Sequence, residues 1–215
     1  MTEETSPLRE RLIDVGTELV LTEGSAAVGL REIARRAGVS HGAPRRYFPT
    51  HQALLSAIAR RGFEDLAARF EAAVADPVSA RGQLEAVSRA YIRYALERRG
   101  MFELIFRHDL LDSASQAPGG PRLRESTLPL LRYAAELVVR CRGERSAGGP
   151  GPAEPPPAVT AAALWSNLHG LAQLWAWGSL PLALGAQGLG DASDEEQRDR
   201  LIAAVLDAHL GPVPS

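Results

Sequence analysis

Apolar residues recur at helical spacing along most of the chain. Leu8, Leu12, Val15 and Leu19 follow one another at three- or four-residue intervals, and residues 30–37 repeat this spacing over a shorter stretch. Positions three and four apart share one face of an α-helix, so each run predicts a helix with one buried face. The pattern continues over residues 51–74, 78–98, 101–111, 122–142 and 194–210. We therefore expect an all-α protein of about nine helices.

Residues 30–48 form the most distinctive stretch. The apolar stripe of residues 30–37 ends at Gly38, which can take the left-handed conformation that closes a helix. Ser40 is a suitable N-cap for a second helix over residues 41–48, in which Pro44 is tolerated because it lies near the first turn. A helix, a turn with glycine and a second helix together predict a helix-turn-helix motif.

The same stretch is strongly basic. Between residues 31 and 51 the only acidic residue is Glu32, whereas the whole chain has a net charge of −2. The arginines are Arg31, Arg35, Arg36, Arg45 and Arg46. A basic island in a slightly acidic protein is typical of an element that contacts DNA.

Three short motifs in the N-terminal region resemble those of a known protein family. The segment EIARRAGVS, followed by YFP and then THQALL, resembles the N-terminal region of the TetR family of bacterial transcriptional regulators. The resemblance implies a three-helix DNA-binding head with a helix-turn-helix in residues 1–49, then a helical ligand-binding and dimerisation domain in residues 50–215. Three positions depart from the usual pattern: Gly29 replaces a Thr or Ser cap, Arg45 replaces a common Tyr, and His51 replaces a common phosphate-binding Lys.

A second resemblance concerns the C-terminal half. The segment AYIRYALERRGMFELIF and the element W-x-x-x-H-G-L, which comprises Trp165, His169, Gly170 and Leu171, resemble one TetR subgroup named for its Trp-His-Gly. Before this element, residues 143–157 are rich in Gly and Pro and predict a mobile loop.

The stretch from residue 155 to residue 190 carries no formal charge. Its length alone would suit a membrane span, but Ser166, Asn167, His169 and Gln173 interrupt the apolar pattern and favour a helix buried on nearly every side. Such a helix needs a partner, and the resemblance implies that the last two helices form a four-helix bundle in a homodimer. The expected dimer contacts are Leu164, Leu168, Leu171, Leu201, Val205 and Leu206.

Composition is that of a soluble globular protein, with 45% hydrophobic and 23% charged residues among 215. The single cysteine, Cys141, excludes an internal disulfide and fits a reducing cytosol. The N-terminus has no apolar segment of the signal-peptide kind, so we expect a cytoplasmic protein that does not enter the membrane.

Double-stranded operator DNA is the partner expected for the head. Arg45 and His41 are expected near base edges, whereas Arg46, Tyr47 and His51 are expected at phosphates, although for any single arginine the alternative is a solvated surface charge. Gly29 offers its backbone N–H to a phosphate. The full set of expected contacts is Gly29, Arg31, Ser40, His41, Gly42, Ala43, Arg45, Arg46, Tyr47 and His51.

The C-terminal domain is expected to hold a cavity for a small apolar effector. Candidate lining residues are Tyr91, Tyr94, Phe102, Phe106, Trp165, His169 and Trp175. The alternative is that these aromatic residues belong to the hydrophobic core and touch no ligand, as aromatic residues at helical spacing usually do. His169 stands out as a polar group in an uncharged helix.

An enzyme is disfavoured. The chain has no G-x-S-x-G, no P-loop and no dinucleotide-binding fingerprint, and its five histidines lack metal-ligand spacing, so we expect no catalytic residue, metal or cofactor. The sequence therefore predicts a dimeric transcription regulator, most simply a repressor released by its ligand. The alternative is a helical small-molecule-binding or protein-interaction module whose head no longer binds DNA.

Overall fold

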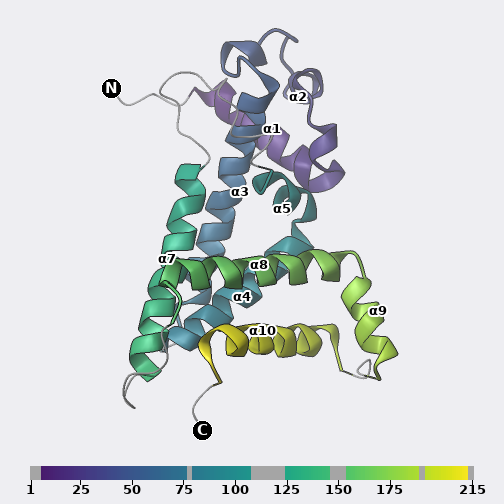
Figure 1. Ribbon diagram of the computed structural model, residues 1–215. Coiled ribbons are helices and arrows are strands. Elements are labelled where there is room, and N and C mark those ends of the chain that lie inside the picture. The colour runs from purple at the N-terminus through teal and green to yellow at the C-terminus, as the bar shows by residue number, and fades with distance from the viewer. Residues whose placement is uncertain (1–5, 77–78, 108–123, 146–153, 189–191, 213–215) are drawn as a thin grey trace. The chain divides into compact units, whose positions relative to one another are not determined.

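The computed structural model of the protein describes residues 6–76, 79–107, 124–145, 154–188 and 192–212. These residues contain nine α-helices, two short 3₁₀ turns and no strand (Figure 1). The helices are α1 (Pro7–Glu23), α2 (Leu30–Arg36), α3 (His51–Ala73), α4 (Ala80–Glu97), α5 (Arg99–Ile105), α7 (Arg124–Arg145), α8 (Pro157–Ala176), α9 (Ser179–Ala186) and α10 (Asp194–Leu210). The turns are η1 (Ser25–Ala27) and η2 (Pro44–Arg46). The predicted all-α fold is confirmed.

The chain divides into two compact units, and each consists of two separate segments. The first unit comprises residues 1–66 and 98–127, and the second comprises residues 67–97 and 128–215. Helix α3 belongs to the first unit up to Leu66 and to the second from Ala67 onward. The domain boundary expected after residue 49 stays a prediction.

Glycines allow the helices of the first unit to approach closely. Gly62 of α3 faces Met101 of α5, and Gly100 of α5 lies directly against the backbone of Val20 in α1. A side chain at Gly100 would push α5 away from the α1 backbone, whereas one at Gly62 would displace the side chains of Met101 and Ile105. The fully buried residues around these contacts include Leu12, Leu19, Ile33, Leu54, Ile58, Met101 and Ile105.

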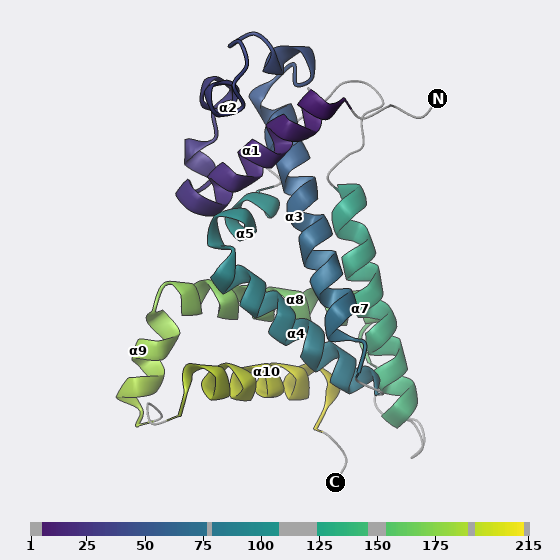
Figure 2. The ribbon, with the colours of Figure 1, turned by 180° about the vertical axis from the view of Figure 1, so that it is seen from behind.

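In the second unit, helices α4, α8 and α10 pack against one another, as both ribbon views show (Figure 2). Helix α9 contacts α8 and contains no buried residue. The core of this unit includes Leu84, Tyr94, Leu164, Ala172, Ile202 and Leu206. Their periodic positions bring one face of each helix to a shared centre, as the apolar pattern predicts.

Two helix boundaries differ from the prediction. The apolar pattern predicts a helix that begins at residue 101, but α5 begins directly after Arg98, which has φ −121° and ψ 42°, so Gly100 lies inside α5. The uncharged stretch was expected to form one helix, but Gly178, with φ 77°, divides it into α8 and α9. A glycine accepts this left-handed conformation without steric cost.

The stretch of residues 143–157, predicted as a mobile loop, is helical at both ends. Gly143 and Arg145 belong to α7, and Pro157 begins α8. Residues 146–153 lie outside the described residues. Within the described part of the chain, no helix combines the length and apolar character needed to cross a membrane.

Replacing Gly100 by Ala should destabilise the protein. The new Cβ would overlap the backbone carbonyl oxygen of Val20, which cannot rotate away as a side chain can. We expect the free energy of unfolding in denaturant titrations to fall by about 1–3 kcal/mol, as in other overpacked cores.

Gly143→Ala is the matched control. Gly143 is also helical but has open space where a Cβ would stand, so this change should raise stability by about 0.5–1 kcal/mol through helix propensity. Equal effects of the two substitutions would contradict the close contact between α1 and α5.

Candidate DNA-binding head and effector site

Helix α2 ends in a well-formed glycine turn. The N–H of Gly38 donates to the carbonyl of Arg35 at 3.2 Å, and the N–H of Val39 donates to the carbonyl of Ala34 at 3.0 Å. This pair of bonds is the Schellman motif, which requires a left-handed residue just past the helix. Gly38 supplies it with φ +66°, so the turn predicted at this residue is confirmed.

The segment after the turn is not the α-helix that the sequence predicts over residues 41–48. Only Pro44–Arg46 form a helical turn, and it is of the 3₁₀ type. In an α-helix that begins at His41, the N–H of residue 44 would donate to the carbonyl of Ser40. Pro44 has no N–H, and the Ser40 carbonyl instead accepts from Ala43 at 3.0 Å. The prediction failed because Pro44 stands at the first position that needs this hydrogen bond.

Two of the five arginines in the basic stretch are neutralised within the head. Arg35 and Arg36 donate from Nε to Glu32 at 2.8 Å and 2.7 Å, and Arg36 also pairs with Glu23 at 2.5 Å. The hydrogen bonds from Arg35 and Arg36 lower the pKa of the Glu32 carboxyl to about 2, so it stays ionised. The pairing with Glu32 follows helical spacing, whereas the pairing with Glu23 does not.

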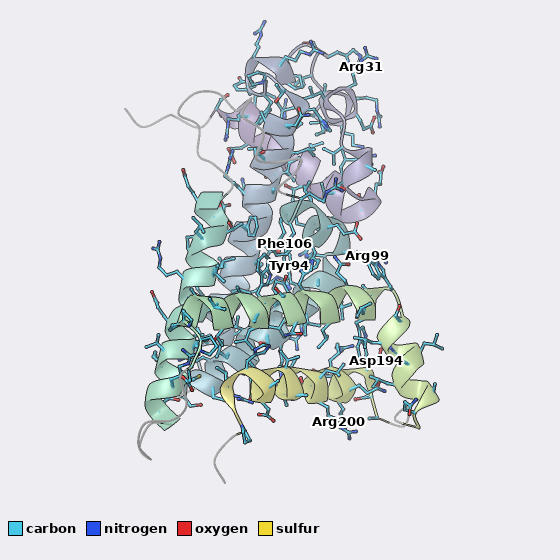
Figure 3. All side chains as sticks on the ribbon, viewed as in Figure 1. Arg31, Tyr94, Arg99, Phe106, Asp194 and Arg200 are labelled. Carbon is cyan, nitrogen blue, oxygen red and sulfur yellow. The ribbon has the colours of Figure 1, made fainter. Side chains whose placement is uncertain are left out.

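The other three arginines remain available. Arg31, Arg45 and Arg46 are exposed, and none of them forms an ion pair with another described residue. Arg31 points away from the packed helices of its unit (Figure 3). His41 and Gly42 are also exposed, in the turn that leads to η2. The positive surface of the head is therefore narrower than the sequence alone suggests.

Two of the predicted phosphate ligands already bind within the head. The Tyr47 hydroxyl lies 3.1 Å from the Ser6 hydroxyl, and Nε2 of His51 lies 2.5 Å from the carbonyl oxygen of Val28. These bonds connect η2 to the start of α1, and the start of α3 to the segment before α2. Gly29 precedes α2 and accepts from the Ile33 N–H at 2.9 Å. Their DNA contacts stay predictions.

In the second unit, three of the predicted effector residues meet. Nε1 of Trp165 donates to the Tyr91 hydroxyl at 3.0 Å, and that hydroxyl lies 2.8 Å from Nδ1 of His169. Tyr91 comes from α4, and the other two come from α8. We refer to Tyr91, Trp165 and His169 as the tyrosine cluster. The sequence nominated all three but contained no signal that they touch.

Burial determines the protonation of the tyrosine cluster. Tyr91 is 5% exposed, and this burial raises the pKa of its hydroxyl, which therefore keeps its proton. Burial also lowers the pKa of the half-buried His169, which favours the neutral ring. With Trp165 donating to the Tyr91 oxygen, this assigns the Tyr91 proton to Nδ1 of His169.

The remaining candidate effector residues occupy packing positions. Tyr94 is fully buried and lies beneath the Arg69 guanidinium at 5.3 Å, and Trp175 lies beneath that of Arg198 at 5.2 Å. Phe102 and Phe106 belong to the first unit, where their rings meet edge to face at 5.0 Å. Their ligand contacts stay predictions, and their surroundings are those of ordinary core aromatics.

The predicted dimer residues divide into two groups. Leu164, Leu168, Leu171 and Leu206 are at most 9% exposed within the single chain. Leu201 and Val205 of α10 keep part of their surface accessible. The first group can therefore offer a partner very little side-chain surface, while large apolar residues elsewhere in the α8–α9 region, residues 157–186, are exposed. Among these are Trp177, 63% exposed, and Leu182, 77% exposed.

The low pKa of His169 predicts a pH-dependent stability. The unfolded chain, with an ordinary histidine pKa of about 6.5, takes up a proton at a higher pH than the folded chain. The free energy of unfolding should therefore be highest above about pH 6.5 and should fall as the pH drops toward the folded pKa. Denaturant titrations at several pH values measure this. The free energy of unfolding should fall less steeply with decreasing pH for His169→Gln than for the native protein. Equal pH dependence of the two proteins would contradict the assignment of a neutral, half-buried His169.

Comparisons with known proteins agree with this geometry. The family model described as bacterial regulatory proteins, tetR family, matches residues 12–58, and that described as tetracyclin repressor-like, C-terminal domain, matches residues 84–208. No curated protein matches the chain.

Solved structures share the fold. A protein of unknown function from Rhodococcus sp. RHA1 has 26% identity and a TM-score of 0.67, over 98% of this chain and 97% of its own. A putative TetR-family transcriptional regulator from Rhodococcus sp. has 16% identity and a TM-score of 0.65, over 95% and 100%. RolR, in complex with the ligand resorcinol, has 18% identity and a TM-score of 0.62, over 95% of this chain and 88% of its own.

The C-terminal match alone spans more than half of the 215 residues, and the N-terminal match covers the helix-turn-helix region. The protein therefore belongs to the TetR family of bacterial regulators, whose members bind DNA and are not enzymes.

Proposed function

We propose that the protein is a cytoplasmic, homodimeric repressor that binds operator DNA and is released from it by a small apolar effector. The observation that carries the DNA-binding role is the group of three exposed arginines, Arg31, Arg45 and Arg46, that have no ion pair within the described residues. Cations without an internal partner are free to release counterions from DNA phosphates, which is the main source of affinity.

Within the head, we assign base reading to Arg45 and His41. Both are exposed next to the small residues Gly42 and Ala43, which allow the backbone to approach a groove closely. An arginine can donate two hydrogen bonds to O6 and N7 of one guanine. Arg31, Arg46 and the N–H of Gly29 are assigned to phosphates. Tyr47 and His51 mainly position the chain, because each already holds a bond within the head.

A second candidate function is a ligand-binding module whose head does not bind DNA. The 3₁₀ turn at Pro44–Arg46 favours it, because the family resemblance implies an α-helix at that place. The two functions differ in duplex binding and in its dependence on salt, since phosphate contacts make affinity fall steeply as salt rises.

We assign the effector to the tyrosine cluster, which supplies a few polar groups in an otherwise apolar region, as ligand sites usually do. The similar structure of RolR holds resorcinol, a small ring with hydroxyl groups. An effector of this kind could compete for the bonds among Tyr91, Trp165 and His169. We also assign the chain to the Trp-His-Gly subgroup through Trp165, His169 and Gly170. Release from DNA requires only that the effector bind one conformation of the dimer more tightly than the other.

For the homodimer, we propose an interface centred on the exposed apolar face of α8 and α9. This face offers Leu174, Trp177 and Leu182, and Val159 extends it toward the start of α8. Several large apolar side chains exposed within one stretch, residues 159–182, are typical of an interaction surface. The partly exposed Leu201 and Val205 of α10 can join it.

Arg45→Ala should weaken operator binding by about tenfold, because it removes one base contact, and should relax sequence preference. The measurement is a titration of labelled upstream DNA by fluorescence anisotropy at two salt concentrations. Arg35→Ala is the control, since Arg35 is exposed but paired with Glu32, and it should change affinity far less. Equal losses from both variants would contradict the assignment of Arg45, and no salt-dependent binding by the native protein would favour the second candidate function.

Trp177→Glu should weaken the dimer by at least about 30-fold, as expected for loss of a central aromatic anchor. Sedimentation equilibrium at micromolar protein measures this. Val139→Glu is the matched control, because Val139 of α7 is 53% exposed but does not belong to the α8–α9 face. A native protein that stays monomeric, or a dimer unaffected by Trp177→Glu, would rule out this interface.

A further inference from the structure

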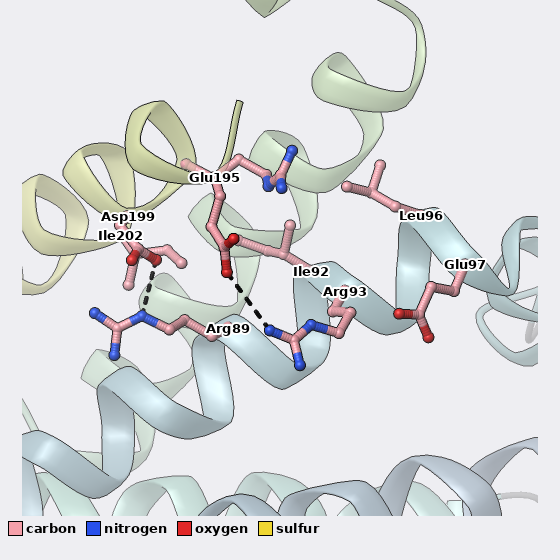
Figure 4. A pocket seen from close by; sticks show the side chains of 9 residues that line it. Arg89, Ile92, Arg93, Leu96, Glu97, Glu195, Asp199 and Ile202 are labelled. Carbon is pink, nitrogen blue, oxygen red and sulfur yellow. Dashed lines mark hydrogen bonds and ion pairs between the residues drawn. The ribbon is translucent and has the colours of Figure 1, made fainter. Parts of the chain in front are cut away.

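A pocket lies within the second unit of the chain. It has a volume of about 280 Å³ and lies between α4 and α10 (Figure 4). Its apolar part consists of Ile92, Leu96 and Ile202, and its arginines are Arg89, Arg93 and Arg198. No member of the tyrosine cluster lines it. This volume is near the lower end for small-molecule sites.

Three ion pairs connect α4 to α10, and we refer to them as the ion-pair ladder. The pocket lies beside the longest of these pairs. Three arginines of α4 face three carboxylates of α10 in antiparallel order: Arg81 with Asp207 at 2.6 Å, Arg89 with Asp199 at 2.8 Å and Arg93 with Glu195 at 3.7 Å. The first two pairs have hydrogen-bonding distances, whereas the third does not. Figure 4 shows the last two pairs bordering the pocket. The pocket therefore lies next to the weakest of the three ion pairs, that between Arg93 and Glu195.

The charges that remain after the short pairs are satisfied favour an anion. Of the acidic residues that line the pocket, Asp199 is held by Arg89, and Glu97 is held by Arg69 at 2.8 Å. Arg93, Arg198 and Glu195 are left. Two positive charges and one negative charge thus lack a short partner.

Among the described residues, Arg93 and Arg198 form only long ion pairs, with which an incoming anion would compete. The nearest carboxylate to Arg198 is that of Asp194 at 3.9 Å, and the side chain of Asp194 is 70% exposed. The side chain of Glu195 is 72% exposed. Exposed, long ion pairs contribute little free energy, so an incoming anion displaces them at little cost. Arg198 is also held in place by Trp175, because its guanidinium carbon lies 5.2 Å from the centroid of the Trp175 ring.

We propose that this pocket binds a small organic carboxylate with an apolar body. Its carboxylate bonds to the guanidinium groups of Arg93 and Arg198, whose planar donor arrangement matches a carboxylate. Its body covers Ile92, Leu96 and Ile202, and burial of that surface favours binding. The site is independent of the proposed DNA contacts and of the effector site at the tyrosine cluster.

Binding has a structural consequence at α10. The ligand carboxylate replaces Glu195 as the partner of Arg93 and so opens the last rung of the ladder, while the rungs at Arg81 and Arg89 keep α10 attached to α4. The start of α10 is therefore the segment that responds to the ligand.

Isothermal titration calorimetry with benzoate as the probe tests the proposal on the full-length protein. We expect saturable binding to one site per chain that weakens with salt. Arg93→Gln should weaken it by at least about fivefold, and Glu195→Gln should strengthen it, because it removes the competing carboxylate. Both residues are exposed and loosely paired, so neither variant endangers folding. Benzyl alcohol, which has the ring but no charge, should bind far more weakly.

Two further variants serve as controls. Arg200→Gln removes an exposed arginine of α10 that does not line the pocket and should leave benzoate binding unchanged. Tyr91→Phe alters the tyrosine cluster and should also leave it unchanged. The proposal is overturned by a lack of saturable binding up to about 10 mM benzoate, by equal affinity of the native and Arg93→Gln proteins, or by loss of binding in Tyr91→Phe, which would locate benzoate at the tyrosine cluster instead.

Discussion

The close contact between α5 and α1 at Gly100 is the constraint on which the N-terminal unit depends. Because Gly100 has no Cβ, the backbone of α5 lies directly against Val20 of α1. Gly62 of α3 leaves space for the side chain of Met101 in α5. Helix α5 comes from a distant part of the sequence and completes the core beneath the helix-turn-helix. The head is therefore not a local motif alone, because a segment beyond residue 98 is part of its packing.

Ion pairing of arginines determines which positive charges remain exposed in both units. In the head, Glu32 and Glu23 neutralise Arg35 and Arg36, which leaves the charge of Arg31, Arg45 and Arg46 to the surroundings. In the C-terminal unit, carboxylates of α10 satisfy two arginines of α4 closely and a third only loosely. In each unit, the arginines without a short partner are where an external anion would gain most, and we propose DNA phosphate for the first unit and a small carboxylate for the second.

The tyrosine cluster is a small polar centre in the most apolar part of the chain. Its three members satisfy one another, which avoids the cost of burying an unpaired hydroxyl or imidazole. The same bonds connect α4 to α8, the two helices that pack most extensively in this unit. A molecule that replaced one of these bonds would therefore change how the two helices meet, and this is the kind of change through which a ligand can act on a dimer.

The sequence by itself determined the helical periods, the turn at Gly38 and the basic character of the head, because all three depend on neighbouring residues. It did not predict the 3₁₀ turn, because Pro44 was expected to be tolerated near the first turn of an α-helix, whereas its missing N–H removes the hydrogen bond to the Ser40 carbonyl. Only the tertiary structure decided which arginines are free and which aromatics meet: Arg36 finds Glu23 across 13 residues, and Tyr91 finds Trp165 and His169 across 74 and 78. Periodicity fixes which face of a helix is buried, but it does not specify the partner, which depends on how the helices pack in space.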